Sequence, residues 1–140
     1  MAEAEQASRL SGLARAMLQT PFLTSLGVVF DRFEPDDVVL RLPFRDDLTN
    51  DGAVYHGGVV AAALDTAGAG AAWSGHDLTK GLRASTISMA VQYVSAARRS
   101  DLVCAARTVR RARELIFTEI TGADDEGRTV AHAVQTYRIA

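Results

Sequence analysis

Apolar and polar residues alternate along this chain with two different periods, and the change of period marks the expected elements. Residues 4–19 repeat apolar side chains every three or four positions, which predicts an amphipathic helix that ends before Pro21. Residues 26–33 and 38–44 have the alternation of strands and are separated by Glu34-Pro35-Asp36-Asp37. This half of the chain is therefore expected to form a helix followed by a β-hairpin.

The second half of the pattern predicts a long helix and then a meander. Residues 45–54 are rich in Asp, Asn and Gly and read as a loop, and residues 57–73 follow as a helix that is apolar nearly all round. Strand-like stretches then cover residues 86–94, 102–111, 115–121 and 129–139. This order predicts an α+β fold in which a long central helix lies against an antiparallel sheet. We expect residues 1–140 to form a single domain, with residues 1–20 as an N-terminal helix.

One carboxylate interrupts the apolar helix and is the first candidate for chemistry. From Gly57 to Trp73 every side chain except that of Asp65 is apolar, absent or a hydroxyl. Burying an ionised carboxylate is unfavourable unless other groups bind it, so a lone Asp here requires an explanation. A hydrogen bond to Thr66 or to nearby backbone is one explanation, and a functional site is the other.

The start of the same helix offers a second chemical group. His56-Gly57-Gly58 opens the helix, whose first backbone N–H groups have no partner within the helix and lie at its positive end. Gly57, without a side chain, can present its N–H to a carbonyl oxygen that develops negative charge. Gly57 and Gly58 are equally compatible with simple close packing of helix on sheet.

The element order and this motif resemble the hotdog-fold thioesterases. His56-Gly57-Gly58 opens the central helix, Asp65 follows nine residues after the His, and the stretch Thr86-Ile-Ser-Met-Ala-Val-Gln-Tyr-Val-Ser-Ala-Ala97 is similar to the family's next strand. The subgroup it resembles is that of the phenylacetic-acid-pathway (PaaI-like) and thioesterase superfamily member 2-like acyl-CoA thioesterases. Ala96 stands where that family commonly has Pro, a departure that bears on the end of the strand. The resemblance covers roughly residues 20–140 and implies a hotdog fold and an acyl-CoA thioesterase.

The resemblance also implies roles for five residues. Asp65 deprotonates a water or attacks the thioester carbonyl itself, and the residues alone leave both routes open. Gly57 is the oxyanion donor, His56 holds the loop or shapes the pocket, and Asn50 and Thr86 orient the water or Asp65. In such proteins Asp65 and Thr86 face Asn50 and Gly57 of a neighbouring subunit. Ordinary roles remain open as well: a His56 that satisfies backbone groups of its loop, an Asn50 in a turn and a Thr86 that is only a strand residue.

Arginines after residue 97 are candidates for binding coenzyme A. Arg98, Arg99, Arg110 and Arg111 stand close together in sequence, and arginine pairs well with the phosphates that coenzyme A carries. Gly58 is a further candidate for substrate contact. The alternative for these arginines is a solvated strand face with charged turns.

Composition disfavours several other classes of protein and site. A net charge of −2 disfavours nucleic-acid binding, and the lone Cys104 in an apolar run is expected to be a buried thiol. The His and Cys residues are too scattered for a metal site, so neither a metal nor a cofactor is expected beyond the coenzyme A of the substrate. The apolar run at 57–73 is too short for a membrane span, and no secretory signal is evident, which favours a cytoplasmic protein.

Two other functions fit a hotdog fold. Asp51 and His56 have the spacing of a hydratase motif, although Ala53 and Val54 replace its Asn-Pro. A non-catalytic acyl-CoA-binding module is the third possibility. We favour an acyl-CoA thioesterase that acts on an aryl or medium-chain acyl group, with homodimers or homotetramers whose active site lies at the dimer interface.

Overall fold

The structure is a computed structural model that describes residues 2–140. Its elements in chain order are α1 Ala2–Leu18, α2 Pro21–Leu26, β1 Val29–Glu34, β2 Asp37–Leu42, η1 Asp46–Leu48, α3 Gly57–Ser74, η2 Leu78–Lys80, β3 Ala84–Tyr93, β4 Leu102–Ala112, β5 Leu115–Ala123 and β6 Thr129–Ile139. The strands form one six-stranded sheet in the order β1-β2-β4-β5-β6-β3, and every neighbouring pair is antiparallel. The predicted α+β architecture is confirmed.

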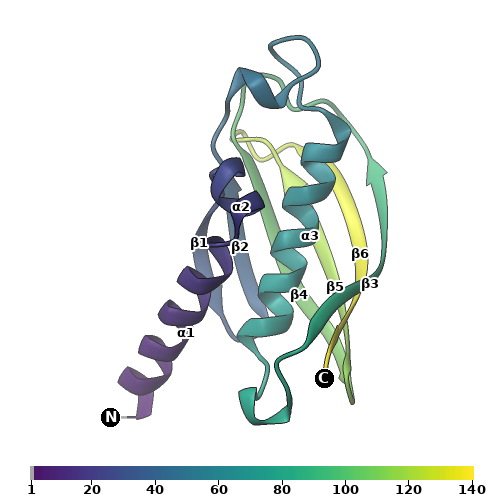
Figure 1. Ribbon diagram of the computed structural model, residues 1–140. Helices are drawn as coiled ribbons and strands as arrows, with labels where there is room; N and C mark the ends of the chain where they lie inside the picture. The colour runs from purple at the N-terminus through teal and green to yellow at the C-terminus, as the bar shows by residue number, and fades with distance from the viewer. Residues whose placement is uncertain (1) are drawn as a thin grey trace.

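Helix α3 lies across one face of this sheet, and the core forms between the two (Figure 1). Its small side chains allow close approach to the strands, and Ala63, Leu64 and Ala67 are fully buried. Opposite them lie fully buried strand residues that include Leu40 and Leu102. Each buried leucine contributes about 1.5–3 kcal/mol of hydrophobic free energy, so this layer is the main source of stability. None of the helices within residues 2–140 combines the length and the apolarity that a membrane span requires.

The N-terminal region differs from the prediction in one element. The expected strand at 26–33 begins only at Val29, because Pro21–Leu26 form the short helix α2. Pro21 occupies the first turn of α2, where its missing N–H is not needed, and Gly27 ends the helix with a left-handed φ of 77°. The two turn-forming residues thus define a helix too short to show a period in the sequence.

Strand β3 is an edge strand. It pairs with β6 on one side only, and nearly all of its residues are exposed. Ile87 and Tyr93 are both more than half exposed although they are large and apolar. An unpaired edge of this kind is a ready site for pairing with another strand.

Candidate active site

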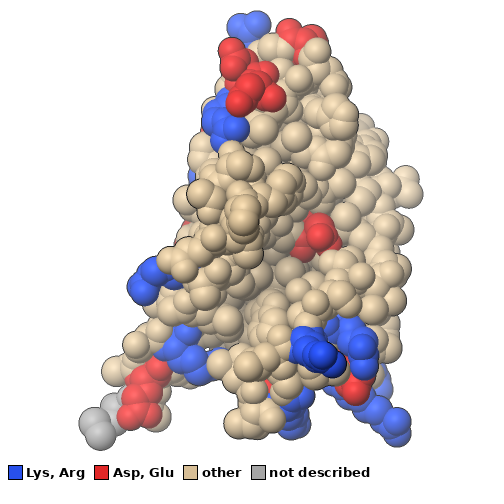
Figure 2. All heavy atoms as spheres, viewed as in Figure 1, with Lys and Arg blue, Asp and Glu red and all other residues tan. Residues whose placement is uncertain are grey.

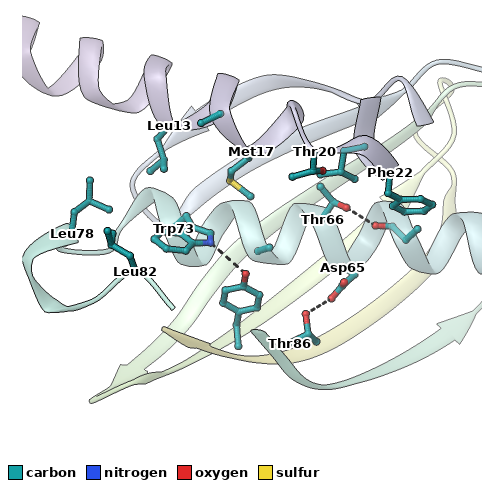
Figure 3. Close-up of a pocket in the computed structure, with 15 residues that line it drawn as sticks. Leu13, Met17, Thr20, Phe22, Asp65, Thr66, Trp73, Leu78, Leu82 and Thr86 are labelled. Atoms are coloured by element: carbon teal, nitrogen blue, oxygen red, sulfur yellow. Dashed lines mark hydrogen bonds between the residues drawn. The ribbon is translucent and has the colours of Figure 1, made fainter. Parts of the chain in front are cut away.

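Asp65 lies in the middle of α3 on the side that faces β3 and β6. It is partly exposed, whereas the next residues of the helix are buried. Thr86, from β3, donates its hydroxyl to Asp65 Oδ1 at 2.8 Å (Figure 3). The structure therefore brings together two of the predicted residues, 21 positions apart in sequence.

Gln135, which the sequence analysis did not single out, is the other partner of Asp65. Its Nε2 donates to Asp65 Oδ1 at 2.8 Å and to the backbone carbonyl oxygen of Asp65 at 3.0 Å. Along β6, residues 131, 133, 135 and 137 face the helix, and Gln135 is the one amide among them. Gln135 is thus a polar side chain on an otherwise apolar strand face, as Asp65 is on an apolar helix. The sequence pattern therefore contained a signal for Gln135.

These contacts divide the Asp65 carboxylate into two unlike oxygens. Oδ1 accepts both side-chain hydrogen bonds, and Oδ2 accepts none from the residues that the structure describes. Two donors on one oxygen restrict rotation of the carboxylate. The oxygen without a protein partner is therefore held in a defined orientation, as a base or nucleophile requires.

An apolar cavity of about 660 Å³ adjoins Asp65. From α3 it is lined by residues 62, 65, 66, 69 and 73, which are three or four positions apart and so share one helix face. The remaining walls come from α1, α2, η2 and the strand residues Thr86 and Tyr137. Figure 2 shows an isolated acidic group in a hollow of otherwise uncharged surface, and Asp65 is the one acidic residue of the lining.

The end of the cavity away from Asp65 is aromatic. Trp73 donates its indole N–H to the hydroxyl oxygen of Tyr137 at 3.3 Å, and Leu78 and Leu82 lie beside Trp73 (Figure 3). Burial raises the pKa of Tyr137; the Trp73 hydrogen bond opposes this effect, and the negative charge of Asp65 adds to it. Tyr137 is thus a neutral phenol in a wall that suits an apolar ligand.

The start of α3 holds the second group of predicted residues. His56 caps the helix, because its Nδ1 accepts the N–H of Gly58 at 2.8 Å. The Gly57 N–H has no hydrogen-bond partner among residues 2–140, whereas the Gly57 carbonyl accepts the hydroxyl of Tyr93 at 2.9 Å. Gly57 is therefore the free donor at this terminus, and the N–H of Gly58 is already in use.

The two groups do not meet within one chain. Gly57 and Asp65 are eight residues apart in α3, which places them about 12 Å apart along the helix axis at about 1.5 Å per residue. Asn50 is exposed in the loop that leads to His56 and Gly57, where its N–H donates to the Val54 carbonyl at 3.0 Å. Hence Asp65 and Thr86 form one half of the predicted site, and Asn50, His56 and Gly57 form the other.

The predicted arginines do not form one cluster. Arg98 and Arg99 are exposed beside the 50–56 loop, where the Arg99 N–H donates to the Ala53 carbonyl at 2.8 Å. Arg110 and Arg111 lie near the end of β4, toward the opposite end of α3. Proximity in sequence was misleading here, because the length of β4 separates the two pairs.

Arg111 has a structural role. Its Nη2 donates to the carbonyl oxygens of Ala71 and Ala72 at 3.2 and 2.7 Å, and its Nε donates to Asp36 Oδ1 at 2.9 Å. A guanidinium at the C-terminus of a helix satisfies carbonyls that lack partners there and complements the helix dipole. Arg111 thereby joins the end of α3 to the β1–β2 hairpin.

The Asp51–His56 pair of the hydratase alternative has separate backbone roles. Asp51 Oδ1 accepts the N–H groups of Ala53 and Val54, both at 2.9 Å, and these bonds hold the pKa of Asp51 below its usual value. His56 caps α3 through Gly58. Neither side chain contacts the other, so the sequence spacing is not accompanied by hydratase geometry.

Comparisons with known proteins agree with the geometry. The model of the thioesterase superfamily matches residues 52–131, more than half of the chain. The medium/long-chain acyl-CoA thioesterase YigI of Escherichia coli is 27% identical over 97% of this chain and 96% of its own. Two solved structures share the fold. PaaI from the E. coli phenylacetic acid degradation operon is 17% identical, with a TM-score of 0.82 over 97% of this chain and 94% of its own. Zebrafish thioesterase superfamily member 2 is 24% identical, with a TM-score of 0.80 over 94% of this chain and 98% of its own. They confirm the predicted hotdog fold.

Proposed function

The chain belongs to the thioesterase superfamily and is a thioester hydrolase, and on this premise we propose that it hydrolyses acyl-CoA thioesters with a medium-chain or aryl acyl group. The observation that carries the proposal is Asp65 in the wall of an apolar cavity, with Oδ1 held by two donors and Oδ2 without a partner among the described residues. The acyl group occupies the cavity, and the thioester carbonyl lies near Oδ2. The similarity to YigI supports a coenzyme A ester as substrate.

The dimensions of the cavity support a medium-chain acyl group. The part of the cavity between Asp65 and Trp73 extends about 12 Å along α3, at about 1.5 Å per residue. An extended alkyl chain advances by about 1.25 Å per carbon, given a C–C bond of about 1.5 Å. The cavity therefore accommodates about eight to ten carbons. The aromatic side chains of Phe22, Trp73 and Tyr137 favour an aryl acyl group as the second candidate.

Hydrolysis then requires an attacking group and a donor for the carbonyl oxygen. Asp65 Oδ2 either takes a proton from a water that attacks the carbonyl carbon or attacks that carbon itself to form an anhydride. In either route the thiolate of coenzyme A leaves as the tetrahedral intermediate collapses. In the general-base route the proton on Asp65 then passes to the thiolate or to solvent. In the nucleophilic route a water hydrolyses the anhydride, which releases the acid and restores the Asp65 carboxylate. An N–H at the positive end of a helix stabilises the oxyanion of that intermediate.

A second subunit supplies this N–H in our proposal. The only free donor found at the start of α3 in the described chain, the Gly57 N–H, is about 12 Å along the helix from its own Asp65, too far to act on the same carbonyl. Antiparallel pairing of two β3 edges would cover the exposed apolar residues of that strand and bring each Asp65 toward the partner subunit's Gly57. Asn50 and His56 would complete that half of the site. We expect a dimer, or a tetramer built from two such dimers.

Arg98 and Arg99 are our candidates for the phosphates of coenzyme A. Both are exposed at the same end of the molecule as Gly57, and Arg98 lies near Asp51, whose pKa it helps to lower. A thioester carbonyl near the Gly57 N–H would leave the pantetheine and nucleotide to extend past this loop. Arg110 is exposed at the other end of β4 and is a weaker candidate.

The decisive experiment measures free-thiol release from straight-chain acyl-CoA esters of 2 to about 16 carbons and from phenylacetyl-CoA. We expect kcat/KM to peak at about eight to ten carbons, and Asp65→Asn to reduce kcat by about 10²–10⁴-fold without changing the melting temperature by more than a few degrees. Ala69→Phe places a ring in the cavity and should lower kcat/KM for long chains while sparing acetyl-CoA. Undiminished thiol release by Asp65→Asn would refute the proposed role of Asp65.

A further inference from the structure

We propose that Gln135 is a positioning residue that holds Asp65 in its reactive orientation; this inference rests on the proposed function of Asp65. The Nε2 group of Gln135 has two N–H bonds and uses both on Asp65, one on the carboxylate and one on the backbone carbonyl. The carboxylate is thereby tied to its own main chain. Rotation about the bond between Cβ and the carboxylate carbon would break the contact to Oδ1.

Burial strengthens this restraint. The Gln135 residue is 3% exposed, and its Oε1 is buried with no hydrogen-bond partner among residues 2–140. A buried amide oxygen without a partner is unfavourable for folding, and such a group in a folded protein calls for an explanation. The orientation of the amide follows from its surroundings, since both nearby groups are oxygens that can only accept. The amide orientation that gives Asp65 two hydrogen bonds therefore leaves the Gln135 Oε1 without one.

The helix accommodates Gln135 through a glycine. A Cβ built on Gly68 would lie 2.6 Å from Cδ and 2.7 Å from Nε2 of Gln135, closer than real Cβ contacts. Gly68 lies one turn after Asp65, so the amide crosses the helix surface where the side chain is missing. Glycine inside a helix is intrinsically unfavourable, and the approach of Gln135 gives the physical reason for it here.

Gln135 and Thr86 restrain the carboxylate differently. Thr86 comes from β3, the exposed edge strand, and contributes one hydroxyl that can rotate. Gln135 comes from β6, which is paired on both sides by β5 and β3, and makes two contacts from a planar amide. The restraint from the interior of the sheet is the stiffer of the two.

The test replaces Gln135 with Met, which has a similar length and no N–H donors. We expect kcat for the preferred acyl-CoA to fall about 10- to 100-fold, the loss expected for one charge-assisted hydrogen bond to a reacting group, with KM changed less than about twofold. In an Asp65→Asn background, Gln135→Met should cause no further loss, because its effect passes through Asp65.

Thr118→Val is the matched control. Thr118 pairs with Gln135 across β5 and β6 and is also buried, and its hydroxyl has no hydrogen-bond partner in the described part of the chain. It makes no hydrogen bond to Asp65, so its replacement should leave kcat unchanged and stability unchanged or higher. Gly68→Ala, which displaces Gln135 without altering its chemistry, keeps the inference testable if Gln135→Met does not fold.

The outcomes separate this inference from the proposed function. Full activity of Asp65→Asn overturns the proposed function itself. If Asp65→Asn is inactive while folded Gln135→Met retains wild-type kcat, only the positioning role is overturned. Equal losses from Gln135→Met in the wild-type and Asp65→Asn backgrounds, or a change confined to KM, assign Gln135 a merely structural role.

Discussion

Replacing Gly68 with Ala tests how closely the proposed catalytic role of Asp65 depends on the packing around its side chain. The new methyl group would overlap Gln135, whose Cδ and Nε2 lie 2.6 and 2.7 Å from the ideal Cβ position. The Gln135 side chain must move, and its two hydrogen bonds to Asp65 break with it. A change at Gly68, which has no direct role in the proposed reaction, should therefore lower kcat by about 10- to 100-fold.

The expected effect on stability is smaller because two contributions oppose each other. Ala in place of Gly inside a helix stabilises it by about 1 kcal/mol. Overpacking of this kind typically costs about 1–3 kcal/mol, so the net destabilisation is about 0–2 kcal/mol. For a chain of 140 residues each kcal/mol corresponds to a shift of about 3–5 °C in Tm. The protein should remain folded at assay temperature.

Gly70→Ala is the matched control in the same helix. Its Cβ would lie 2.9 Å from two ring carbons of Phe30, on the side of α3 that faces β1 and β2. The change in helix propensity is identical and overpacking is again expected, so Tm should respond similarly while kcat stays close to that of the wild type. Thermal unfolding and steady-state thiol release on both variants give the comparison.

A third variant identifies the route of the effect. Gln135→Ala removes the obstacle, so adding Gly68→Ala to it should leave kcat as low as in Gln135→Ala alone. The reasoning fails if Gly68→Ala retains wild-type kcat, if Gly70→Ala loses as much activity, or if Gly68→Ala lowers kcat further in the Gln135→Ala background.

Three other predictions concern residues outside this contact. Arg111→Ala should lower the free energy of unfolding by about 1–3 kcal/mol, because the carbonyls at the end of α3 lose a charged donor. Arg99→Ala should mainly raise KM for acyl-CoA. A rise in KM for Arg111→Ala together with a loss of stability for Arg99→Ala would contradict both assignments. His56→Asn keeps a side chain that can cap α3, whereas His56→Ala does not. If only the Asn variant retains kcat, His56 acts by capping the helix. If both variants lose kcat equally, the imidazole takes a direct part in the reaction. Burial raises the pKa of the Cys104 thiol to about 12, so a thiol reagent at pH 8 should label it only as the protein unfolds. Rapid labelling of the folded protein would contradict this and show that the thiol is accessible.

Much of the architecture followed from local patterns. The apolar run from Gly57 to Trp73 predicted α3 to within a residue, and the alternation after residue 86 predicted the four strands that follow. The predicted meander was wrong for the first of these strands, because β3 pairs with β6 at the edge of the sheet and β4 pairs with β2 and β5. Helix α2 escaped because six residues are fewer than two helical turns, too short for a period to appear. The resemblance of the His56-Gly57 and Asp65 motif to hotdog thioesterases was confirmed by the family match.

The sequence predicted several residues of the candidate site, but it did not predict how they are arranged. Asp65 stood out because an isolated carboxylate on an apolar helix is physically anomalous, and the structure places Thr86 against it. Gln135 carried the same kind of anomaly on β6, but its relation to Asp65 was not visible. These residues are 70 positions apart and become neighbours only through the pairing of β6 with the rest of the sheet.

The sequence by itself determined which segments are helix or strand, which faces are apolar and which polar groups are out of place, because these properties depend on periodicity over a few residues. Only the tertiary structure decided that Arg98 and Arg111 lie at opposite ends of the molecule, that α1 and α2 line a cavity beside Asp65, and that Gln135 donates a hydrogen bond to the Asp65 carboxylate. Those relations depend on strand order, register and the docking of helices on the sheet. Such features arise from contacts between distant segments, whose energies do not appear in any local stretch of the chain.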